Sequence, residues 1–330
     1  MQVLKFGGTS IATATNISRV LDIVGNAARK DRVILVCSAI SGCTDSLIRI
    51  GEGVIHYQDR ITELEERHQQ IITRLFTGVQ REEALEECRG IFDQIKQRPP
   101  VTEAFGEILS TRIIARKLAC DGIEVQWLDS RKIIIKDNLE ATYANIASAI
   151  ENRRAVRVFV APGFIAGDGN GRVTTLGRGG SDYSAALFAA GSGAETLQIW
   201  TDVPGIMTTN PKDLPQAYTI PRISYESAWR MAEHGAKVLY PPTVEPAQKA
   251  GIKINILNTF DPDNTGTTVD DFPGEKGWIG LSRKDDYIYL ITAGNVDKDS
   301  VRSRINGVLD RSCIFWDVRS IASQASRLRI

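Results

Sequence analysis

Short runs of apolar, mostly β-branched residues alternate along the chain with longer stretches in which apolar residues recur every three or four positions. The short runs predict buried strands, and the longer stretches predict amphipathic helices. Their alternation favours an α/β sandwich with a mostly parallel sheet. The expected strands lie at 2–6, 33–39, 123–129, 132–135, 154–166, 171–175, 195–202 and 253–259. The expected helices lie at 16–29, 103–122, 181–193 and 224–236, and Thr9 or Ser10 is expected to cap the first of them.

Residues 57–97 have a different pattern. Segments 59–76 and 81–95 carry apolar residues at helical spacing among many charged ones, and Pro99-Pro100 ends the region. This predicts two amphipathic helices that form an all-helical insertion rather than a separate domain. A solvated helix face accounts for the charge in this region better than a binding patch does.

The composition changes again at about residue 271, where DDFPGEKG is a candidate linker. Beyond it, segments 287–294, 296–309 and 313–318 have the patterns of a strand, a helix and a strand. The sequence therefore predicts a short βαβ tail at the carboxyl end.

Composition and charge exclude several classes of function. The 330 residues include 40 basic and 40 acidic side chains, which gives no electrostatic reason to expect binding to nucleic acid or to an anionic membrane. Five scattered cysteines and three histidines show no metal-ligand spacing, and no apolar run is long enough to span a bilayer. We therefore expect a cytoplasmic protein without a signal peptide, a disulfide framework or a metal site built from protein ligands.

Two glycine-rich turns carry the candidate chemistry. The first, KFGGTS, has Lys5 just before Gly7 and Gly8, at the end of an expected strand and the start of a helix. Free backbone N–H groups and the helix dipole favour a phosphate at such a position, although a structural turn fits the same residues. The lysine precedes the glycines, so this turn is not a Walker A loop.

The second turn, GRGGSD, runs from Gly177 to Asp182, again between an expected strand and an expected helix. Its structural interpretation is a tight turn in which Ser181 or Asp182 caps the helix. In the functional interpretation, Arg178 binds a carboxylate through two parallel hydrogen bonds while the glycine amides face an anion. Two such turns in one α/β sheet indicate a shared crevice at the carboxyl ends of the strands. This arrangement supports phosphoryl transfer without defining the acceptor.

A set of motifs adds a family resemblance. KFGGTS, SAISGCTD, GEILSTR, GRGGSDYSAALFAA, WTDVPGIMTTNP, GAKVLYP and NTFDPDNTGT occur in the order found in aspartate kinases, and the chain resembles this branch of the amino-acid kinase family from Met1 to about Val269. The resemblance implies a three-layer α/β/α sandwich at 1–270, with an amino-acid-binding half at 1–155 and a nucleotide-binding half at 156–270. It also implies ATP-dependent phosphorylation of L-aspartate to 4-phospho-L-aspartate, the first step of lysine, threonine and methionine biosynthesis, with ATP and Mg²⁺ as cofactors.

The resemblance implies roles for individual residues of the amino-acid site. Lys5 is similar to the lysine that bridges the transferring phosphoryl group, and Asp182 to a residue that orients groups or handles magnesium through water. Glu107 resembles the acid that faces the substrate α-ammonium group, and Arg178 resembles the carboxylate clamp. The other substrate contacts implied are Ser38, Thr44, Gly179, Gly180 and Ser181.

The ATP contacts implied by the resemblance are Lys5, Gly7, Gly8, Thr201, Asp202, Met207, Lys212, Lys237 and Val238. Aspartate kinases usually have IYTTDPR where this chain has IMTTNPK, so Met207 replaces an aromatic residue, Asn210 an aspartate and Lys212 an arginine. Methionine stays a flexible apolar contact, and lysine keeps the charge but loses the bidentate fork. Together these changes predict weaker or altered nucleotide binding.

The tail departs further from the family pattern. Aspartate kinases usually end in a pair of ACT regulatory domains, whereas residues 271–330 resemble at most one truncated ACT unit. This predicts that feedback inhibition by lysine or threonine is absent or needs a partner chain, and it leaves open a homodimer or association with a longer homologue. Two alternatives to aspartate kinase activity also stay open. One is a kinase for another amino-acid carboxylate, and the other is a non-catalytic regulatory subunit that binds nucleotide weakly.

Overall fold

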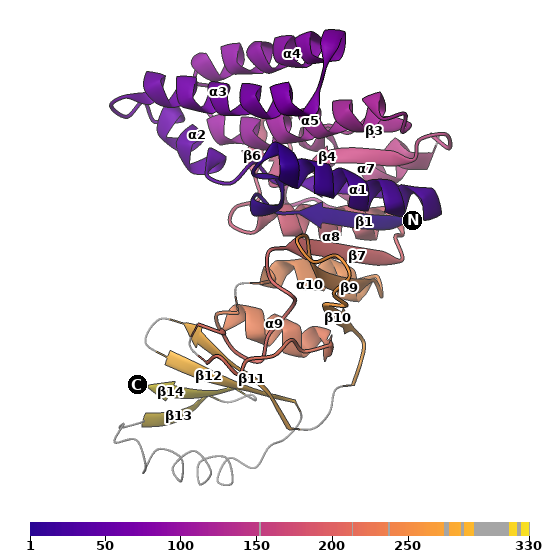
Figure 1. Ribbon diagram of the computed structural model, residues 1–330. Coiled ribbons are helices and arrows are strands. Elements are labelled where there is room, and N and C mark those ends of the chain that lie inside the picture. Colours follow the sequence, from indigo (N-terminus) through magenta and orange to yellow (C-terminus); the bar gives the residue numbers. More distant parts are fainter. Residues whose placement is uncertain are drawn as a thin grey trace. The chain divides into compact units, whose positions relative to one another are not determined.

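The computed structural model describes residues 1–151, 153–212, 214–236, 238–273, 277–284, 287–293, 317–321 and 325–329 of the chain. They form two compact units, Met1–Asp202 with Thr259–Pro262 and Val203–Asn258 with Asp263–Ile330, coloured along the chain in Figure 1. The amino-acid-binding and nucleotide-binding halves implied by the resemblance stay a prediction, because compact units describe packing rather than ligand binding.

The first unit holds most of the regular structure. Its strands are β1 Gln2–Phe6, β2 Val33–Cys37, β3 Val125–Trp127, β4 Val158–Pro162, β5 Ile165–Gly167, β6 Val173–Thr175 and β7 Thr196–Thr201. Its helices are α1 Ala14–Lys30, α2 Cys43–Gly51, α3 Tyr57–Leu75, α4 Gly78–Lys96, α5 Phe105–Cys120, α6 Ser130–Ile133, α7 Leu139–Glu151 and α8 Gly180–Ser192. Two 3-10 turns, η1 Thr9–Ile11 and η2 Thr102–Ala104, precede α1 and α5.

A parallel sheet forms the centre of this unit, with its strands in the order β3-β4-β2-β1-β7. Every residue of β2 and β4 is buried, which is typical of a parallel sheet covered on both faces. Helices α1 and α5 contact each other on one face, and α7 and α8 pack together on the other (Figure 1). The expected three-layer α/β/α sandwich is therefore confirmed.

Two expectations about local structure are wrong. Residues 132–135 do not form a strand, because the Asp129 side chain accepts a hydrogen bond from the Arg131 amide and caps the short helix α6. The helix α1 is capped by Thr13, whose hydroxyl accepts a hydrogen bond from the Asn16 amide, rather than by Thr9 or Ser10. Ser10 is fully buried instead, and its hydroxyl lies 2.7 Å from that of Thr259.

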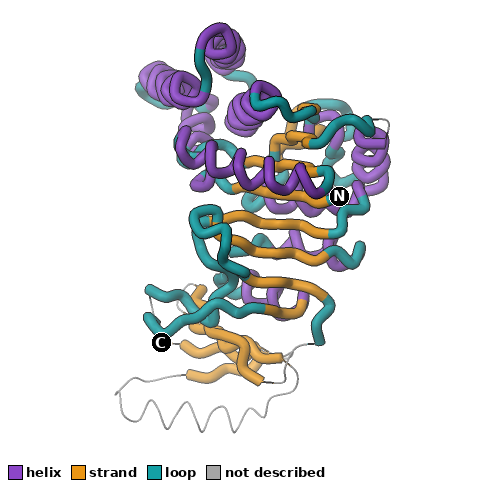
Figure 2. The backbone as a smooth tube through the Cα atoms, turned by 45° about the vertical axis from the view of Figure 1, so that its right-hand side comes forward, coloured by secondary structure: helices purple, strands orange, loops and turns teal. Residues whose placement is uncertain are grey.

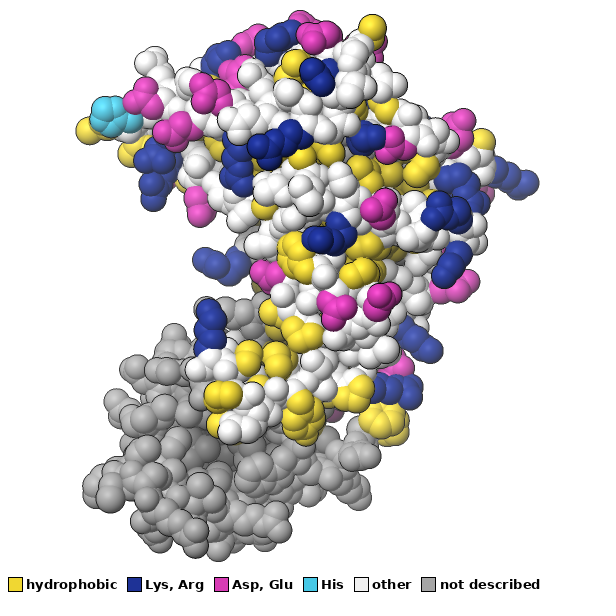
Figure 3. Space-filling view, in the orientation of Figure 1, with side chains coloured by type: hydrophobic (Ala, Val, Ile, Leu, Met, Phe, Trp, Pro, Cys, Tyr) yellow, Lys and Arg dark blue, Asp and Glu magenta, His cyan; other side chains and the backbone are white. Residues whose placement is uncertain are grey.

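The two helices expected within 57–97 are present as α3 and α4, which pack side by side as a hairpin (Figure 2). Apolar residues such as Leu64 and Ile72 of α3 and Phe92 and Ile95 of α4 are buried. Basic and acidic side chains are interspersed on the outer surface of this region (Figure 3), which agrees with a solvated face.

The second unit contains the remaining elements. They are β8 Arg222–Ser224, α9 Tyr225–Glu233, η3 Pro241–Thr243, α10 Val244–Lys249, β9 Lys253–Asn258, β10 Thr267–Asp270, β11 Gly277–Lys284, β12 Tyr287–Ala293, β13 Asp317–Ile321 and β14 Ala325–Arg329. Strand β10 pairs in parallel with β8 and antiparallel with β9, and a separate antiparallel sheet has the order β11-β12-β14-β13.

The expected strand at 287–294 is confirmed as β12, and β11 before it was not expected. The expected tail helix at 296–309 lies outside the described residues, so the βαβ tail and its likeness to an ACT domain stay predictions. Among the described helices of both units, none combines the length and apolarity needed to cross a bilayer.

Candidate active site

A pocket of about 230 Å³ in the first unit brings together all the residues predicted to be catalytic or to bind the substrate. It is lined by Lys5, Ser38, Thr44, Glu107, Phe164, Gly177, Arg178, Gly179, Gly180, Ser181 and Asp182. Lys5 near the end of β1 and the turn before α8 therefore meet at one pocket, as their sequences predict, whereas Gly7 and Gly8 of the turn after β1 do not line it.

The parallel sheet explains why these residues meet. Lys5 is paired in register with Val36 of β2 and Ile199 of β7, so it lies near the carboxyl ends of all three strands. The turn before α8 comes back to the same edge, and there Gly177 and Gly179 have φ values of 74° and 71°. Only glycine adopts this left-handed conformation without strain, which accounts for the glycines of GRGG.

Lys5 and Asp182 form an ion pair at the pocket wall. The Lys5 Nζ lies 2.6 Å from Asp182 Oδ1, and the two side chains are only 11% and 14% exposed. Lys5 comes from β1, and Asp182 from the first turn of α8, where the helix dipole favours a negative charge. The ammonium group is thus held at a fixed position beside the pocket.

Glu107 brings a carboxyl group of a different kind into the same pocket. It is 3% exposed; its Oε1 accepts a hydrogen bond from the Ala39 amide at 3.0 Å, and its Oε2 is buried with no hydrogen-bond partner among the described residues. Burial raises the pKa of the Glu107 carboxyl to about 8. A buried oxygen without a partner is costly unless a ligand supplies a donor, so this position is suited to a cation.

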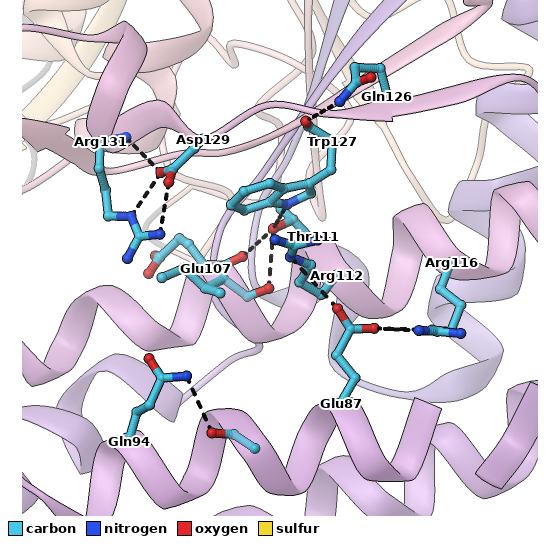
Figure 4. A network of polar contacts seen from close by, with 12 residues as sticks. Glu87, Gln94, Glu107, Thr111, Arg112, Arg116, Gln126, Trp127, Asp129 and Arg131 are labelled. Carbon is cyan, nitrogen blue, oxygen red and sulfur yellow. Dashed lines mark hydrogen bonds and ion pairs between the residues drawn. The ribbon is translucent and has the colours of Figure 1, made fainter. Parts of the chain in front are cut away.

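The helix that carries Glu107 is held by a polar network on β3 and α4 (Figure 4). The Thr111 hydroxyl donates to the Glu107 carbonyl oxygen at 2.6 Å, and the Trp127 indole N–H donates to the Thr111 hydroxyl at 3.0 Å. The Arg112 guanidinium lies over the Trp127 ring at 3.8 Å, and Arg116 pairs with Glu87 of α4 at 2.9 Å. These contacts fix α5, and hence Glu107, against its neighbours.

Arg178 lines the pocket but is exposed. No ion pair of Arg178 occurs among the described residues, so its guanidinium is available to an anionic ligand at the rim. The nearby Cys37 and Cys43 are buried, and burial raises the pKa of each thiol to about 12. Both thiols stay protonated, as expected for buried small residues rather than nucleophiles.

The two glycines after Lys5 have different surroundings. The Gly7 amide donates to the Trp200 carbonyl oxygen at 3.4 Å, whereas no hydrogen bond of the Gly8 amide is found within the described part of the chain. A Cβ atom on Gly8 would lie 2.7 Å from the Ala39 carbonyl oxygen, so only glycine fits there. The Gly8 amide is therefore the better placed of the two to donate to a phosphate.

Phe164 is a pocket residue that the sequence analysis did not identify. Its φ of 64° is left-handed, a strained conformation for a bulky residue. Hydrogen bonds hold it there: its amide donates to the Ser184 hydroxyl at 2.9 Å, and its carbonyl oxygen accepts from the Leu176 amide at 2.8 Å. Strained backbone often marks a functional site, but no pattern in the sequence signals it here.

A second, larger pocket of about 630 Å³ lies within the second unit. It brings together three of the predicted nucleotide residues, Met207, Lys212 and Val238, along with the substituted Asn210. Ser282 of β11 also lines it; this residue is 6% exposed, and its hydroxyl has no partner among the described residues. Sequence analysis did not single out Ser282, because its strand lies in the segment interpreted as the tail.

The other predicted nucleotide residues are found elsewhere. Thr201 and Asp202 belong to the first unit, where the Thr201 hydroxyl donates to Asp202 Oδ1 at 3.2 Å, and they line neither of these two pockets. Lys237 lies outside the described residues. No cluster of three or more histidine, cysteine or acidic side chains able to hold a metal ion occurs in the part of the chain that the structure describes.

Comparisons with known proteins identify the family of the chain. The model of the amino acid kinase family matches residues 1–258. The aspartokinase of Chlamydia pneumoniae is 34% identical over 81% of this chain and 62% of its own length, and lysine-sensitive aspartokinase 3 of Escherichia coli is 35% identical over 81% of this chain and 63% of its own length. The chain thus spans somewhat less than two thirds of these curated relatives.

Solved structures give the same result. Escherichia coli aspartokinase III in complex with aspartate and ADP superposes with a TM-score of 0.76 at 30% identity, covering 100% of this chain and 78% of that one. Clostridium acetobutylicum aspartate kinase has a TM-score of 0.77 at 23% identity, with the same coverage, and supports the fold alone. The chain belongs to the amino acid kinase family. These relatives and structures are aspartokinases, the branch of the family that the sequence motifs indicate.

Proposed function

We propose that the chain is an aspartate kinase, which transfers the γ-phosphoryl group of ATP to the side-chain carboxylate of L-aspartate. One observation supports this most strongly: a single small pocket is lined by Lys5, Arg178 and the buried, unpartnered carboxyl oxygen of Glu107. Aspartate carries two carboxylates and one ammonium group, so two cations and one anion complement it. The complex of Escherichia coli aspartokinase III with aspartate and ADP supports the same pair of ligands.

The proposed recognition follows from charge. Glu107 Oε2 accepts a hydrogen bond from the substrate α-ammonium group, and Arg178 forks onto a carboxylate with its planar guanidinium. Ser38, Thr44 and Ser181, which line the same pocket, supply hydroxyl groups, and Gly179 and Gly180 supply backbone amides. A dicarboxylate that lacks the ammonium group would leave the buried Glu107 oxygen without a partner.

The proposed chemistry needs no general base. The substrate side chain is already a carboxylate, so one of its oxygens attacks the γ-phosphorus while the bond to the β–γ bridging oxygen breaks and ADP leaves. The transition state carries charge on its peripheral oxygens, and positioned cations and amides stabilise it. Lys5, held by Asp182, supplies the cation, and the Gly8 amide supplies a donor.

The nucleotide is proposed to use the pocket of the second unit, with Met207 and Val238 as apolar contacts and Lys212 as the cation. Ser282 joins this set because its buried hydroxyl lacks a partner among the described residues. Magnesium fits the donor set without a protein cage, since it is usually held by phosphates, water and one or two carboxylates. Asp182 would be its carboxylate contact through water, and the ion would supply charge neutralisation on the phosphates.

The test is trapping of the acyl phosphate. The purified chain with ATP, Mg²⁺, L-aspartate and hydroxylamine is expected to form aspartyl hydroxamate above the level without aspartate. Succinate, which matches aspartate except for the α-ammonium group, is expected to give none. Absence of hydroxamate from aspartate would refute the kinase proposal, and equal rates with succinate would refute the role of Glu107.

A further inference from the structure

Arg67 of α3 reaches out of the helical insertion and contacts two loops beside the pocket. Its Nη1 donates to the Ser41 carbonyl oxygen at 2.7 Å, and its Nη2 to the Ala12 carbonyl oxygen at 3.4 Å. Ala12 lies in the loop after β1 (residues 7–13, the first loop), and Ser41 in the loop after β2 (residues 38–42, the second loop). One guanidinium group thus bridges two loops that are far apart in the sequence.

The second loop is also the point where contacts to the pocket converge. The Ala39 amide donates to Glu107 Oε1 at 3.0 Å, and the Ser41 amide donates to the Gly8 carbonyl oxygen at 3.2 Å. The loops are packed so closely that a Cβ atom on Gly8 would lie 3.1 Å from the Ser41 nitrogen. A shift of the second loop would therefore disturb Glu107 on one side and the Gly8 backbone on the other.

The helix that carries Arg67 is held in place by packing against its neighbours. The neighbouring His68 is fully buried; its Nδ1–H donates to the Leu64 carbonyl oxygen at 2.7 Å, and its ring lies edge-on to Phe92 of α4 at 5.5 Å. Burial lowers the pKa of His68 to about 4, so at neutral pH the ring is uncharged and does not repel Arg67. Helix α3 also packs against α1 and α2, which follow the first and second loops.

We propose that Arg67 is a positioning residue: its forked contact holds the two loops in register and thereby sets the geometry of Gly8 and Glu107. The helical insertion then supports the active site through Arg67, although its outer face is solvated. A planar guanidinium has several N–H donors at fixed positions, so it can donate to both carbonyl oxygens at once. A lysine ammonium group is a compact point charge and is less suited to two separated acceptors. This inference rests on the proposed aspartate kinase function.

The kinetic test compares Arg67→Met and Arg67→Lys with Arg74→Met. Arg74 is exposed about two turns further along the same helix, and it is the matched control. Arg67→Met is expected to lower kcat/KM for aspartate by roughly 10- to 100-fold, because small misplacements of reacting groups are costly. The Kd for ADP is expected to stay unchanged in Arg67→Met. The kcat/KM of Arg67→Lys is expected to lie between the values of Arg67→Met and wild type, and that of Arg74→Met to equal the wild-type value. If Arg67→Lys had the kcat/KM of wild type, the proposed need for two guanidinium hydrogen bonds would be wrong.

Hydrogen exchange gives a readout that does not depend on activity. The Ala39 and Ser41 amides are expected to exchange faster in Arg67→Met than in wild type and Arg74→Met, because their bonds to Glu107 and Gly8 open more often. If the wild-type chain forms no hydroxamate, the kinase proposal fails, and exchange alone still tests the loop contact. If these amides exchanged at the wild-type rate in Arg67→Met, the positioning role would be wrong. Faster exchange with an unchanged kcat/KM, or a lower Tm with unchanged kinetics, would also exclude it.

Discussion

The pocket of the first unit and the pocket of the second unit differ in how they present charge. The first is small, about 230 Å³, and four charged residues line it: Lys5, Glu107, Arg178 and Asp182. The second is larger, about 630 Å³, and among the described residues that line it Lys212 is the one charged side chain. Apolar residues such as Met207, Val238 and Leu281 make up much of its wall.

This difference indicates two modes of recognition. In the first pocket two of these groups are positioned before any ligand arrives: Lys5 is held by Asp182, and the Glu107 carboxyl is held by the Ala39 amide and by burial. Groups fixed in advance suit a small substrate whose charges must match point by point, and they suit stabilisation of a transition state. A roomy apolar pocket with few polar groups suits a larger, flatter ligand, which is held mainly by contact area. Changes in the first pocket should therefore cost much more than changes in the second.

The largest effect is expected from Lys5→Met. It should lower kcat by about 10³-fold and leave the Kd for ADP nearly unchanged, since a cation aimed at developing charge acts mainly in the transition state. Hydroxamate formation measures the first quantity and calorimetry the second. Adding Asp182→Asn removes the unpaired carboxylate and should not restore turnover. Turnover of Lys5→Met within a few fold of wild type would contradict the catalytic role.

Glu107→Gln is expected to raise KM for aspartate by roughly 30- to 100-fold, the size of a lost hydrogen bond between charged groups. The amide oxygen still accepts from the Ala39 amide, so the fold is kept while the anion is lost. Steady-state kinetics at varied aspartate concentration measure the effect, and an unchanged Tm is the control. An unaltered KM would show that the ammonium group binds elsewhere.

The pH dependence of aspartate binding is expected to follow Glu107, whose pKa in the empty pocket is raised to about 8. At pH 7 the carboxyl is then mostly protonated, and binding of an ammonium ion favours the carboxylate and expels the proton. Affinity should therefore increase between pH 6 and 8, by up to about tenfold per pH unit, and level off above pH 8. Calorimetry in buffers with different ionisation enthalpies should detect the released proton. Glu107→Gln should abolish both effects, and a flat profile in wild type would exclude the coupling.

The smallest effect is expected in the second pocket. Met207→Tyr should lower the Kd for ADP by about threefold, because a rigid aromatic ring gains contact area and stacking that methionine lacks. KM for aspartate should not change, which separates the two pockets. Weaker ADP binding in this variant would show that the methionine is adapted to its surroundings.

Several features of the active site could be predicted from the sequence. Two glycine turns in one α/β unit predict a shared crevice at the carboxyl ends of the strands, and Lys5, Arg178 and Asp182 line one pocket there. The strand before GRGGSD, β6, pairs antiparallel with β5 outside the parallel sheet, so the order of the strands alone does not bring the second turn to this edge. Glu107 is different: helical spacing alone suggests a solvated glutamate, and only the family motif assigned it a role. Its burial arises because α5 is enclosed on nearly every side.

Other features needed the coordinates, because they depend on contacts between distant residues. The forked contact of Arg67 joins residues 26 and 55 positions away, and nothing in the charged pattern of 57–97 distinguishes it from the other arginines there. The same holds for Phe164, whose strained φ is fixed by hydrogen bonds to Ser184 and Leu176, and for Ser282, which β11 brings into the second pocket.

The sequence by itself determined the α/β class, the two glycine turns and the chemistry they can hold, because local periodicity and turn residues act over a few positions. Only the tertiary structure decided which oxygen of Glu107 lacks a partner, how Asp182 holds Lys5, and which arginine of the insertion reaches the loops. Burial and long-range hydrogen bonds exist only once the chain has packed, and they set the charge and position of each group in the site.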